Sequence, residues 1–320
     1  RTEELVLHLR AVCPPEKTAE ALDILRAHAG VAHLIVHRGA AVTPEGDLVE
    51  ADIAREAADE IVAALCVLEL DHTGGITLEA IDTALSDAAD AAEEAAPGEG
   101  ADAVVWEELL ARTGEESRLN VTFLAFLTIA CLLAAVGVLT DSAVTIVGAM
   151  VVGPEFGPLA ALAVGLVLRR WDLVRLAGGA LGIGFPLAMV VTLGGALLVR
   201  VTDVFGEKAF ELKQHSEVDF VFSVGVPSLV VAMLAGAAGM LAMTSAKSAA
   251  LVGVFISVTT VPAAGYAVIA AVAGEWSRCV QSVGQLLVNL LGIVAAAAIV
   301  LIVRRNGQRS PVGMRPLSRG

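Results

Sequence analysis

One acidic residue, Glu155, lies deep inside an apolar segment of the sequence, between two prolines four positions apart. The segment reads Gly153-Pro154-Glu155-Phe156-Gly157-Pro158. Each proline removes a backbone N–H and the glycines permit unusual dihedral angles, so we expect a helix to break here. A carboxylate inside a membrane must be protonated, paired or in contact with water. These residues therefore predict a proton or cation site. The alternative is a neutral carboxyl group that hydrogen-bonds a freed backbone group.

A second group of polar residues precedes a proline in a later apolar segment. These residues are Ser257, Thr259, Thr260 and Pro262. Broken helices present carbonyl groups to cations and N–H groups to anions, so we predict a solute or ion site built from both segments. A kink that only shapes helix packing is the alternative. Gln285 and Asn289, spaced by four, either line this site or hydrogen-bond between helices.

The elements that must position these residues are apolar runs of about 20 residues, each long enough to cross a hydrocarbon core of about 30 Å. Hydrophobic residues make up 56% of the chain and charged residues only 18%, which argues against a soluble enzyme. We therefore predict an α-helical membrane protein with six transmembrane helices. The predicted spans are 119–139, 143–168, 174–199, 226–243, 248–273 and 278–303.

The second and fifth predicted spans resemble each other. Both begin with Ser-Ala, contain a proline near the middle, become rich in alanine and end at a tryptophan. The first three and last three spans, 119–199 and 226–303, are therefore predicted to be inverted three-helix repeats with broken helices 2 and 5. Matching interrupted spans in two halves are a pointer to a transporter binding site.

Positive charges orient the predicted spans. If the N-terminus lies inside, eleven basic residues flank the spans on the inner side and four flank them on the outer side. The inner residues are Arg112, Arg118, Arg169, Arg170, Arg175, Lys247, Arg304, Arg305, Arg309, Arg315 and Arg319. The outer residues are Arg200, Lys208, Lys213 and Arg278. We therefore expect a multi-pass protein of the bacterial inner membrane with both termini in the cytoplasm.

The two halves of the chain carry opposite charge. Residues 1–118 hold 8 Lys and Arg against 26 Asp and Glu, whereas residues 119–320 hold 13 against 9. Over the whole chain acidic residues outnumber basic ones, which argues against a nucleic-acid partner. The order of strand and helix patterns in residues 1–80 is β-α-β-β-α-β, which predicts an α+β ferredoxin-like domain. Residues 81–118 are an acidic helical linker. Its amphipathic stretch 103–117 lies either on the membrane surface or against the N-terminal domain.

Other reactive residues give no chemical motif. His8, His33 and His37 fall on predicted strands, but no acidic or cysteine partner stands at a suitable spacing, so we expect them to be structural. The four cysteines show no metal-ligand spacing. The sequence contains no HExxH motif, no GxSxG motif and no paired aspartates within spans. We therefore predict no catalytic residues, no metal site and no cofactor, and expect that the protein is not an enzyme.

The motif around the first break resembles a known family. Ser142, the run Gly148-Ala149-Met150, Pro154 and the pair Gly157-Pro158 are similar to the pattern of a bacterial and archaeal membrane family catalogued as domain of unknown function 389. The resemblance covers roughly residues 119–300. It implies a membrane identity and a soluble N-terminal domain, but brings no established activity. Glu155 departs from the apolar residue that the resemblance implies at its position.

Three functions remain open at this point. The first is a secondary transporter of a small solute or ion, with its site at the broken helices. The second is an oligomeric channel lined by the glycine-rich spans, and the third is a membrane sensor with a cytoplasmic ligand-binding domain. The expected partners are membrane lipid, a small solute or ion and further copies of the chain. The tail 304–320 is basic and suits an anionic inner leaflet.

Overall fold

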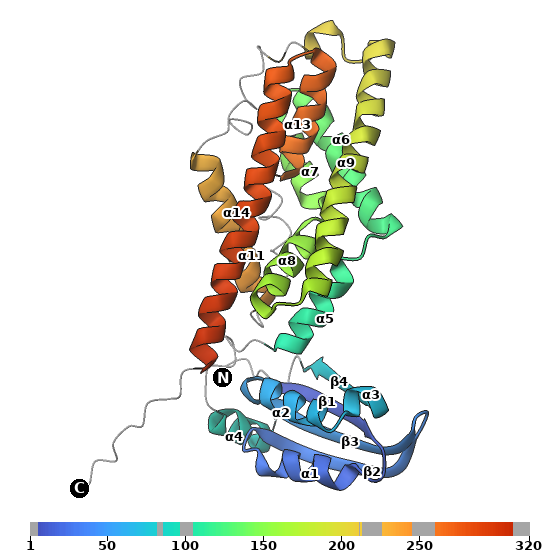
Figure 1. Cartoon of the computed structure of the whole chain (residues 1–320), viewed down its shortest axis with the longest axis vertical. Helices are drawn as coiled ribbons and strands as arrows, with labels where there is room; N and C mark the ends of the chain where they lie inside the picture. The colour runs from blue at the N-terminus through green and yellow to red at the C-terminus, as the bar shows by residue number, and fades with distance from the viewer. Residues whose placement is uncertain are drawn as a thin grey trace, which may run out of the picture. The chain divides into compact units, whose positions relative to one another are not determined.

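The computed structural model of the chain describes residues 6–81, 86–96, 105–210, 212, 226–244 and 260–309. The chain divides into two compact units, and the main boundary falls between Leu109 and Leu110. Figure 1 labels the elements along the chain. The largest part of the first unit is Arg1–Leu109, which we call the N-terminal domain. The second unit contains Leu110–Met243 and Ser248–Arg305, which we call the membrane region.

The N-terminal domain is built on one four-stranded antiparallel sheet with the strand order β2-β3-β1-β4. The predicted order β-α-β-β-α-β is confirmed, with a short extra helix, α3, before the last strand. The elements are β1 (Val6–Cys13), α1 (Thr18–Ala27), β2 (Val31–Val42), β3 (Glu45–Ala54), α2 (Arg55–Val67), α3 (Leu70–Thr73) and β4 (Gly75–Ala80).

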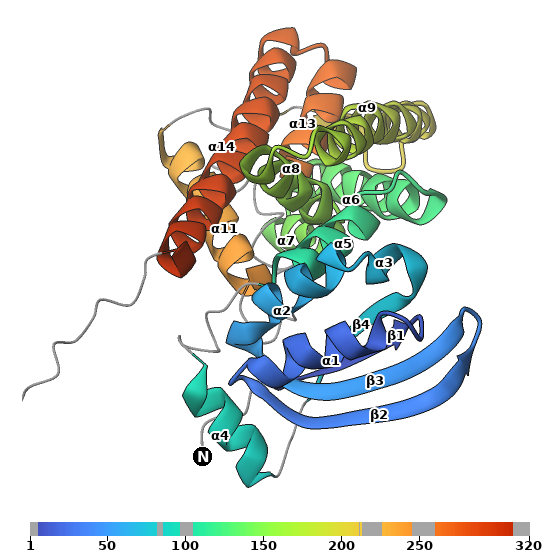
Figure 2. The ribbon, with the colours of Figure 1, turned by 60° about the horizontal axis from the view of Figure 1, so that its bottom comes forward.

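The alternation of apolar and polar residues along the strands separates the two faces of this sheet. Side chains of alternate residues in a strand point to opposite faces. Leu7 and Leu9 of β1 and Ile53 of β3 are buried in one core with residues of α1 and α2. Both helices therefore cover the same face, as Figure 2 shows. The other face, which we call the open face, carries the intervening polar residues.

Two helices lie in the segment predicted as an acidic linker. Helix α4 (Asp87–Ala95) begins at the N-cap residue Ser86 and packs against β2 and β3, with Ala89 and Ala92 buried. Helix α5 (Trp106–Glu116) follows further along the chain. The first part of the linker is therefore packed on the domain rather than fully exposed.

The membrane region contains helices of the length and apolar composition of membrane spans. Four helices pass this test singly, and the pair α7 and α8 passes it together, with a bend of 54° between them. The helices are α6 (Val121–Leu139), α7 (Ala143–Val152), α8 (Phe156–Leu168), α9 (Trp171–Thr202), α11 (Val226–Thr244), α13 (Thr260–Ala273) and α14 (Trp276–Arg309). The helices α9 and α14 contain 32 and 34 residues, so both are longer than the predicted spans.

The described residues thus give four or five spans, and the prediction of six is not confirmed. The difference lies in the fifth predicted span, 248–273, of which residues 248–259 are outside the described residues. Its described part is α13, whose 14 residues are shorter than a span. The inverted repeats likewise remain a prediction.

Helix α13 is the most enclosed helix of the membrane region. All residues from 260 to 270 are buried. A Cβ atom placed on Gly265 would lie 2.7 Å from the Cβ atom of Ala134 in α6, so the two helices approach closely at this glycine. By contrast, α9 exposes large apolar side chains such as Val190 and Leu198. Apolar side chains turned outward are expected where lipid is the solvent.

Candidate functional site: the break between α7 and α8

The predicted break is present at Gly153-Pro154-Glu155. Helix α7 ends at Val152, Gly153 adopts an extended conformation, and α8 begins at Phe156. Because Pro154 has no N–H and clashes with the preceding turn, it disfavours the continuation of α7. The helix axis changes direction by 54° across this short segment. The break thus places Glu155 at the start of α8.

The second proline of the motif does not break the helix. Pro158 is the third residue of α8, where a backbone N–H would have no partner inside the helix. A proline is therefore tolerated there. Pro262 holds the same place in the described part of α13, as its third residue. The expectation that both Pro154 and Pro158 interrupt the helix is thus corrected, because only Pro154 lies at the interruption.

The carboxyl group of Glu155 is fully buried and contacts the start of α13. The Thr260 hydroxyl donates a hydrogen bond to Glu155 Oε1 at 2.5 Å. Both side chains have no exposed surface. The structure therefore brings together the two interrupted segments that the sequence analysis predicted to share one site. Ser257 and Thr259, the other hydroxyl residues predicted here, lie outside the described residues.

The start of α8 and the first described turn of α13 meet at this carboxyl group. Glu155 directly precedes α8, and Thr260 is the first described residue of α13. The N-terminus of a helix carries a partial positive charge, which favours a negative charge next to it. The site can therefore accommodate an ionised carboxylate, and protonation of that carboxylate would remove a charge from a buried place. Such a group can take up and release a proton or a cation.

Gly157 of the motif has a packing role that the sequence analysis missed. A Cβ atom at this position would lie 2.7 Å from the Cβ atom of Glu116, the last residue of α5. The hydroxyl of Ser117 lies 3.5 Å from the carbonyl oxygen of Gly157. The end of α5 therefore packs directly on the first turn of α8. The amphipathic pattern of residues 103–117 indicated a buried side of this helix, but not its contact.

Gln285 and Asn289 take part in hydrogen bonds between helices. Gln285 Nε2 donates to the hydroxyl of Ser228 in α11 at 2.9 Å, and that hydroxyl donates to Asn289 Oδ1 at 3.1 Å. Ser282, one turn earlier in α14, donates to the carbonyl oxygen of Ala263 in α13 at 2.8 Å. These bonds attach α14 to two neighbouring helices, which is the second of the two roles left open for this polar face.

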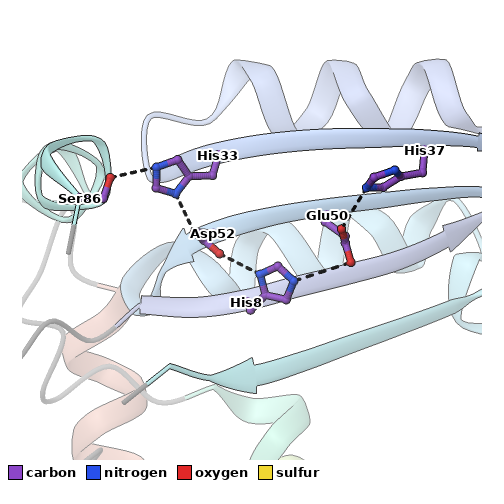
Figure 3. Close-up of polar contacts among 6 residues, drawn as sticks. All are labelled: His8, His33, His37, Glu50, Asp52 and Ser86. Atoms are coloured by element: carbon purple, nitrogen blue, oxygen red, sulfur yellow. Dashed lines mark hydrogen bonds and ion pairs between the residues drawn. The ribbon is translucent and has the colours of Figure 1, made fainter. Parts of the chain in front are cut away.

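The histidines of the N-terminal domain do have acidic partners. Asp52 lies between His8 and His33, with Nδ1 to carboxylate distances of 2.8 and 2.7 Å. Glu50 lies 3.9 Å from His8 Nε2 and 3.4 Å from His37 Nε2. The expectation of no partner is wrong because these carboxylates come from β3, the neighbouring strand, and not from a nearby sequence position (Figure 3). Across the described ranges, no group of three or more such side chains has metal-binding geometry.

Comparison with known families places the break inside a recognised domain. Residues 150–295 match the family model described as "Domain of unknown function (DUF389)", which confirms the resemblance over this range. The matched range contains the break, α13 and the polar face of α14. Searches of the curated proteins and of the solved structures gave no match.

Proposed function

We propose that this protein, whose residues 150–295 match the DUF389 family model, is a secondary transporter of a small solute or ion, driven by protons or cations at Glu155. One observation carries the proposal: the hydrogen bond from Thr260 to the buried Glu155 joins the break before α8 to the described part of α13. Buried acidic residues at membrane depth are costly and mark ion pathways in many transporters. The bound species would sit among Gly153, Pro154 and the first turns of α8 and α13.

The remaining features of the proposal follow the charge pattern and the repeats. We place the protein in the bacterial inner membrane with both termini in the cytoplasm, as a homo-oligomer. The fifth span would include residues 248–259 ahead of α13, which would give six spans in two inverted repeats. In that arrangement the break before α8 and the segment before α13 are equivalent, and substrate sites of such transporters lie where equivalent interrupted helices meet.

Flux measurements on the reconstituted protein test the role of Glu155. Liposomes containing the protein and the pH-sensitive dye pyranine would be exposed to gradients of Na⁺, K⁺, chloride and phosphate, one at a time. We expect that at least one gradient drives proton movement that saturates with ion concentration. Glu155→Gln should abolish this movement, because the amide cannot exchange a proton, while assembly by size-exclusion chromatography is unchanged.

Asp141→Asn is the matched control, because it neutralises an acidic residue in the turn between α6 and α7. It should leave the proton movement intact. Equal flux in Glu155→Gln and wild type would contradict the coupling role. An unsaturable conductance in planar bilayers would favour the channel. Ligand binding by the protein with no flux of any kind would favour the sensor.

A further inference from the structure

Five titratable side chains form an alternating chain on the open face of the N-terminal sheet. Along the chain the order is His33, Asp52, His8, Glu50 and His37. We call this group the histidine–carboxylate cluster. Figure 3 shows the three imidazole rings, from β1 and β2, turned toward the two carboxylates of β3 between them. A proton taken up by any ring therefore changes the charge next to at least one carboxylate.

The end of this chain touches the cap of another element. His33 Nε2 lies 2.9 Å from the hydroxyl oxygen of Ser86, the N-cap residue of α4. That oxygen also accepts hydrogen bonds from the backbone N–H groups of Ala88 and Ala89, at 3.2 and 3.4 Å. The first backbone N–H groups of a helix have no acceptor within the helix, and the oxygen of an N-cap hydroxyl accepts hydrogen bonds from them. The start of α4 is thus connected to the cluster through one hydroxyl group.

The hydrogen bonds of neutral His33 are mutually consistent. Its Nδ1 faces Asp52, which accepts hydrogen bonds, so Nδ1 carries the proton and Nε2 is an acceptor. Ser86 can then donate its hydroxyl proton to Nε2 while its oxygen accepts from the backbone of α4. When His33 is protonated, Nε2 becomes a donor. The Ser86 hydroxyl must then turn away and share its oxygen between the imidazolium and the backbone N–H groups.

We propose that the histidine–carboxylate cluster is a proton-sensitive clasp for α4, in which protonation of His33 weakens the Ser86 cap and loosens the first turn of α4. The positive charge of protonated His33 would also destabilise the start of α4. A positive imidazolium beside the positive N-terminal end of a helix is unfavourable. The clasp responds to cytoplasmic acidity if the termini lie in the cytoplasm, and its operation does not depend on the proposed transport.

Other charged groups lie on the open face of the sheet and on α4. Within the described residues, the open face also carries Arg10, paired in register with Glu50, and Glu79, paired in register with His8. In α4, Asp87 and Asp90 lie in the first turn and are exposed, so solvent screens their attraction for the imidazolium. In the second half of α4, Glu93 raises the pKa of Glu56 in α2, after the larger effect of burial. Acid therefore acts on both ends of α4, and the test must isolate His33.

Deuterium exchange of the full chain in lipid nanodiscs isolates this effect. Protection factors of the peptide 86–96 would be compared between about pH 8 and about pH 5, where histidine side chains ordinarily change charge. Helix α1 serves as the internal reference. We expect the protection of the first turn of α4 to fall about fivefold on acidification, the loss typical of a weakened N-cap. In His33→Gln the fall should disappear, because the glutamine oxygen can accept from Ser86 but does not titrate.

Two further variants keep the result decisive. His72→Gln is the matched control, because His72 is an exposed histidine of the same domain that pairs only with Asp71 in the described contacts. It should respond to acid as the wild type does. Ser86→Ala removes the cap and should show low protection at both pH values, even if His33→Gln perturbs the sheet. The proposal is wrong if the protection of α4 in the wild type does not change with pH. It is also wrong if the protection of α4 in Ser86→Ala falls on acidification as much as in the wild type.

Discussion

Thr260 donates its hydroxyl hydrogen bond to Glu155 across 105 positions of sequence, and both residues are completely buried. Glu155 stands at the start of α8, and Thr260 is the first described residue of α13. The contact therefore joins the start of α8 to the described part of α13. Any change in the protonation of Glu155 acts directly on this junction.

The first prediction concerns the hydroxyl group of Thr260. Thr260→Val keeps the shape of the side chain and removes the hydrogen bond to Glu155. A hydrogen bond to a charged group contributes about 1.5–3 kcal/mol, so we expect the proton-linked flux to fall by about tenfold or more. Thr260→Ser keeps the hydroxyl and should retain flux. Proteoliposomes with internal pyranine provide the measurement.

A second buried threonine provides the control for this substitution. The hydroxyl of Thr192 donates to the carbonyl oxygen of Ala188 within its own helix, α9, at 2.8 Å. Thr192→Val also removes a buried hydroxyl, but from the interior of a helix and away from Glu155. It should leave the flux near the wild-type value. Equal losses in Thr192→Val and Thr260→Val would show that the hydroxyl of Thr260 has no special role.

Much of the fold could be predicted because its signals are local. The length of an apolar run determines whether a helix can cross a membrane, and α6 and α11 lie within two residues of the predicted spans. Alternating apolar residues in β1 and β3 likewise defined the sheet. The helix breaker Pro154 was visible for the same reason, since its effect depends on its own ring and the preceding turn.

The contacts between distant elements could not be predicted in this way. Glu50 and Asp52 meet the histidines because β3 pairs with both β1 and β2, and the register of that pairing is not written in any one strand. The approach of Glu116 to Gly157 also depends on how α5 packs on α8. Pairing Glu155 with Thr260 was possible because the two interrupted segments resemble each other in sequence.

The second prediction tests the close approach at Gly157. Gly157→Ala adds a Cβ atom 2.7 Å from the Cβ atom of Glu116, so α5 or α8 must shift. Overpacking of this kind costs about 1–3 kcal/mol, and we expect thermal denaturation in detergent at a temperature several degrees lower. Gly148→Ala in α7 is the control, because nothing lies within 4 Å of the added atom. It should be neutral or stabilising, as alanine favours helix formation.

The third prediction concerns Glu56 in α2. Burial raises the pKa of its carboxyl group, and the charge of Glu93 raises it further. A raised pKa in the folded state means that stability is lost as the pH rises through that value. Glu56→Gln should therefore stabilise the domain at neutral pH, by less than about 1 kcal/mol because partial exposure screens the charge.

Alkylation of Cys13 in urea measures this effect, since Cys13 is fully buried in β1 and reacts when the domain opens. Glu56→Gln should react more slowly than wild type at neutral pH. Glu60→Gln, on the same helix but with an exposed side chain, should react at the wild-type rate. Below about pH 4, where glutamate is largely protonated in unfolded chains, deuterium exchange should show no advantage for Glu56→Gln. A neutral-pH rate above wild type would refute the destabilising role of this carboxylate.

The fourth prediction concerns Asp47 in β3, whose carboxylate joins the hairpin of β2 and β3. The backbone N–H of Gly39 donates to Asp47 Oδ1 at 2.8 Å, and Arg38 Nη1 donates to Oδ2 at 2.6 Å. These contacts lower the pKa of Asp47, with the hydrogen bond from Gly39 as the largest cause and further bonds from Thr18 and Arg38. A lowered pKa stabilises the folded state above the ordinary value of about 3.9 and ceases to do so as the pH falls through the folded value.

Asp47→Asn should therefore reduce the deuterium-exchange protection of β1 at neutral pH, because Cys13 of β1 is paired in register with Asp47. The difference from wild type should shrink as the pH falls below about 4, where the carboxylate becomes protonated in the unfolded chain, and should vanish once the pH has fallen below the lowered pKa of the folded state. Asp23→Asn is the control, since Asp23 is exposed on α1 and lies 4.0 Å from its partner Arg26. It should match wild type at every pH. A difference between Asp47→Asn and wild type that stays constant down to strongly acidic pH would locate the effect in packing rather than in the charge of Asp47.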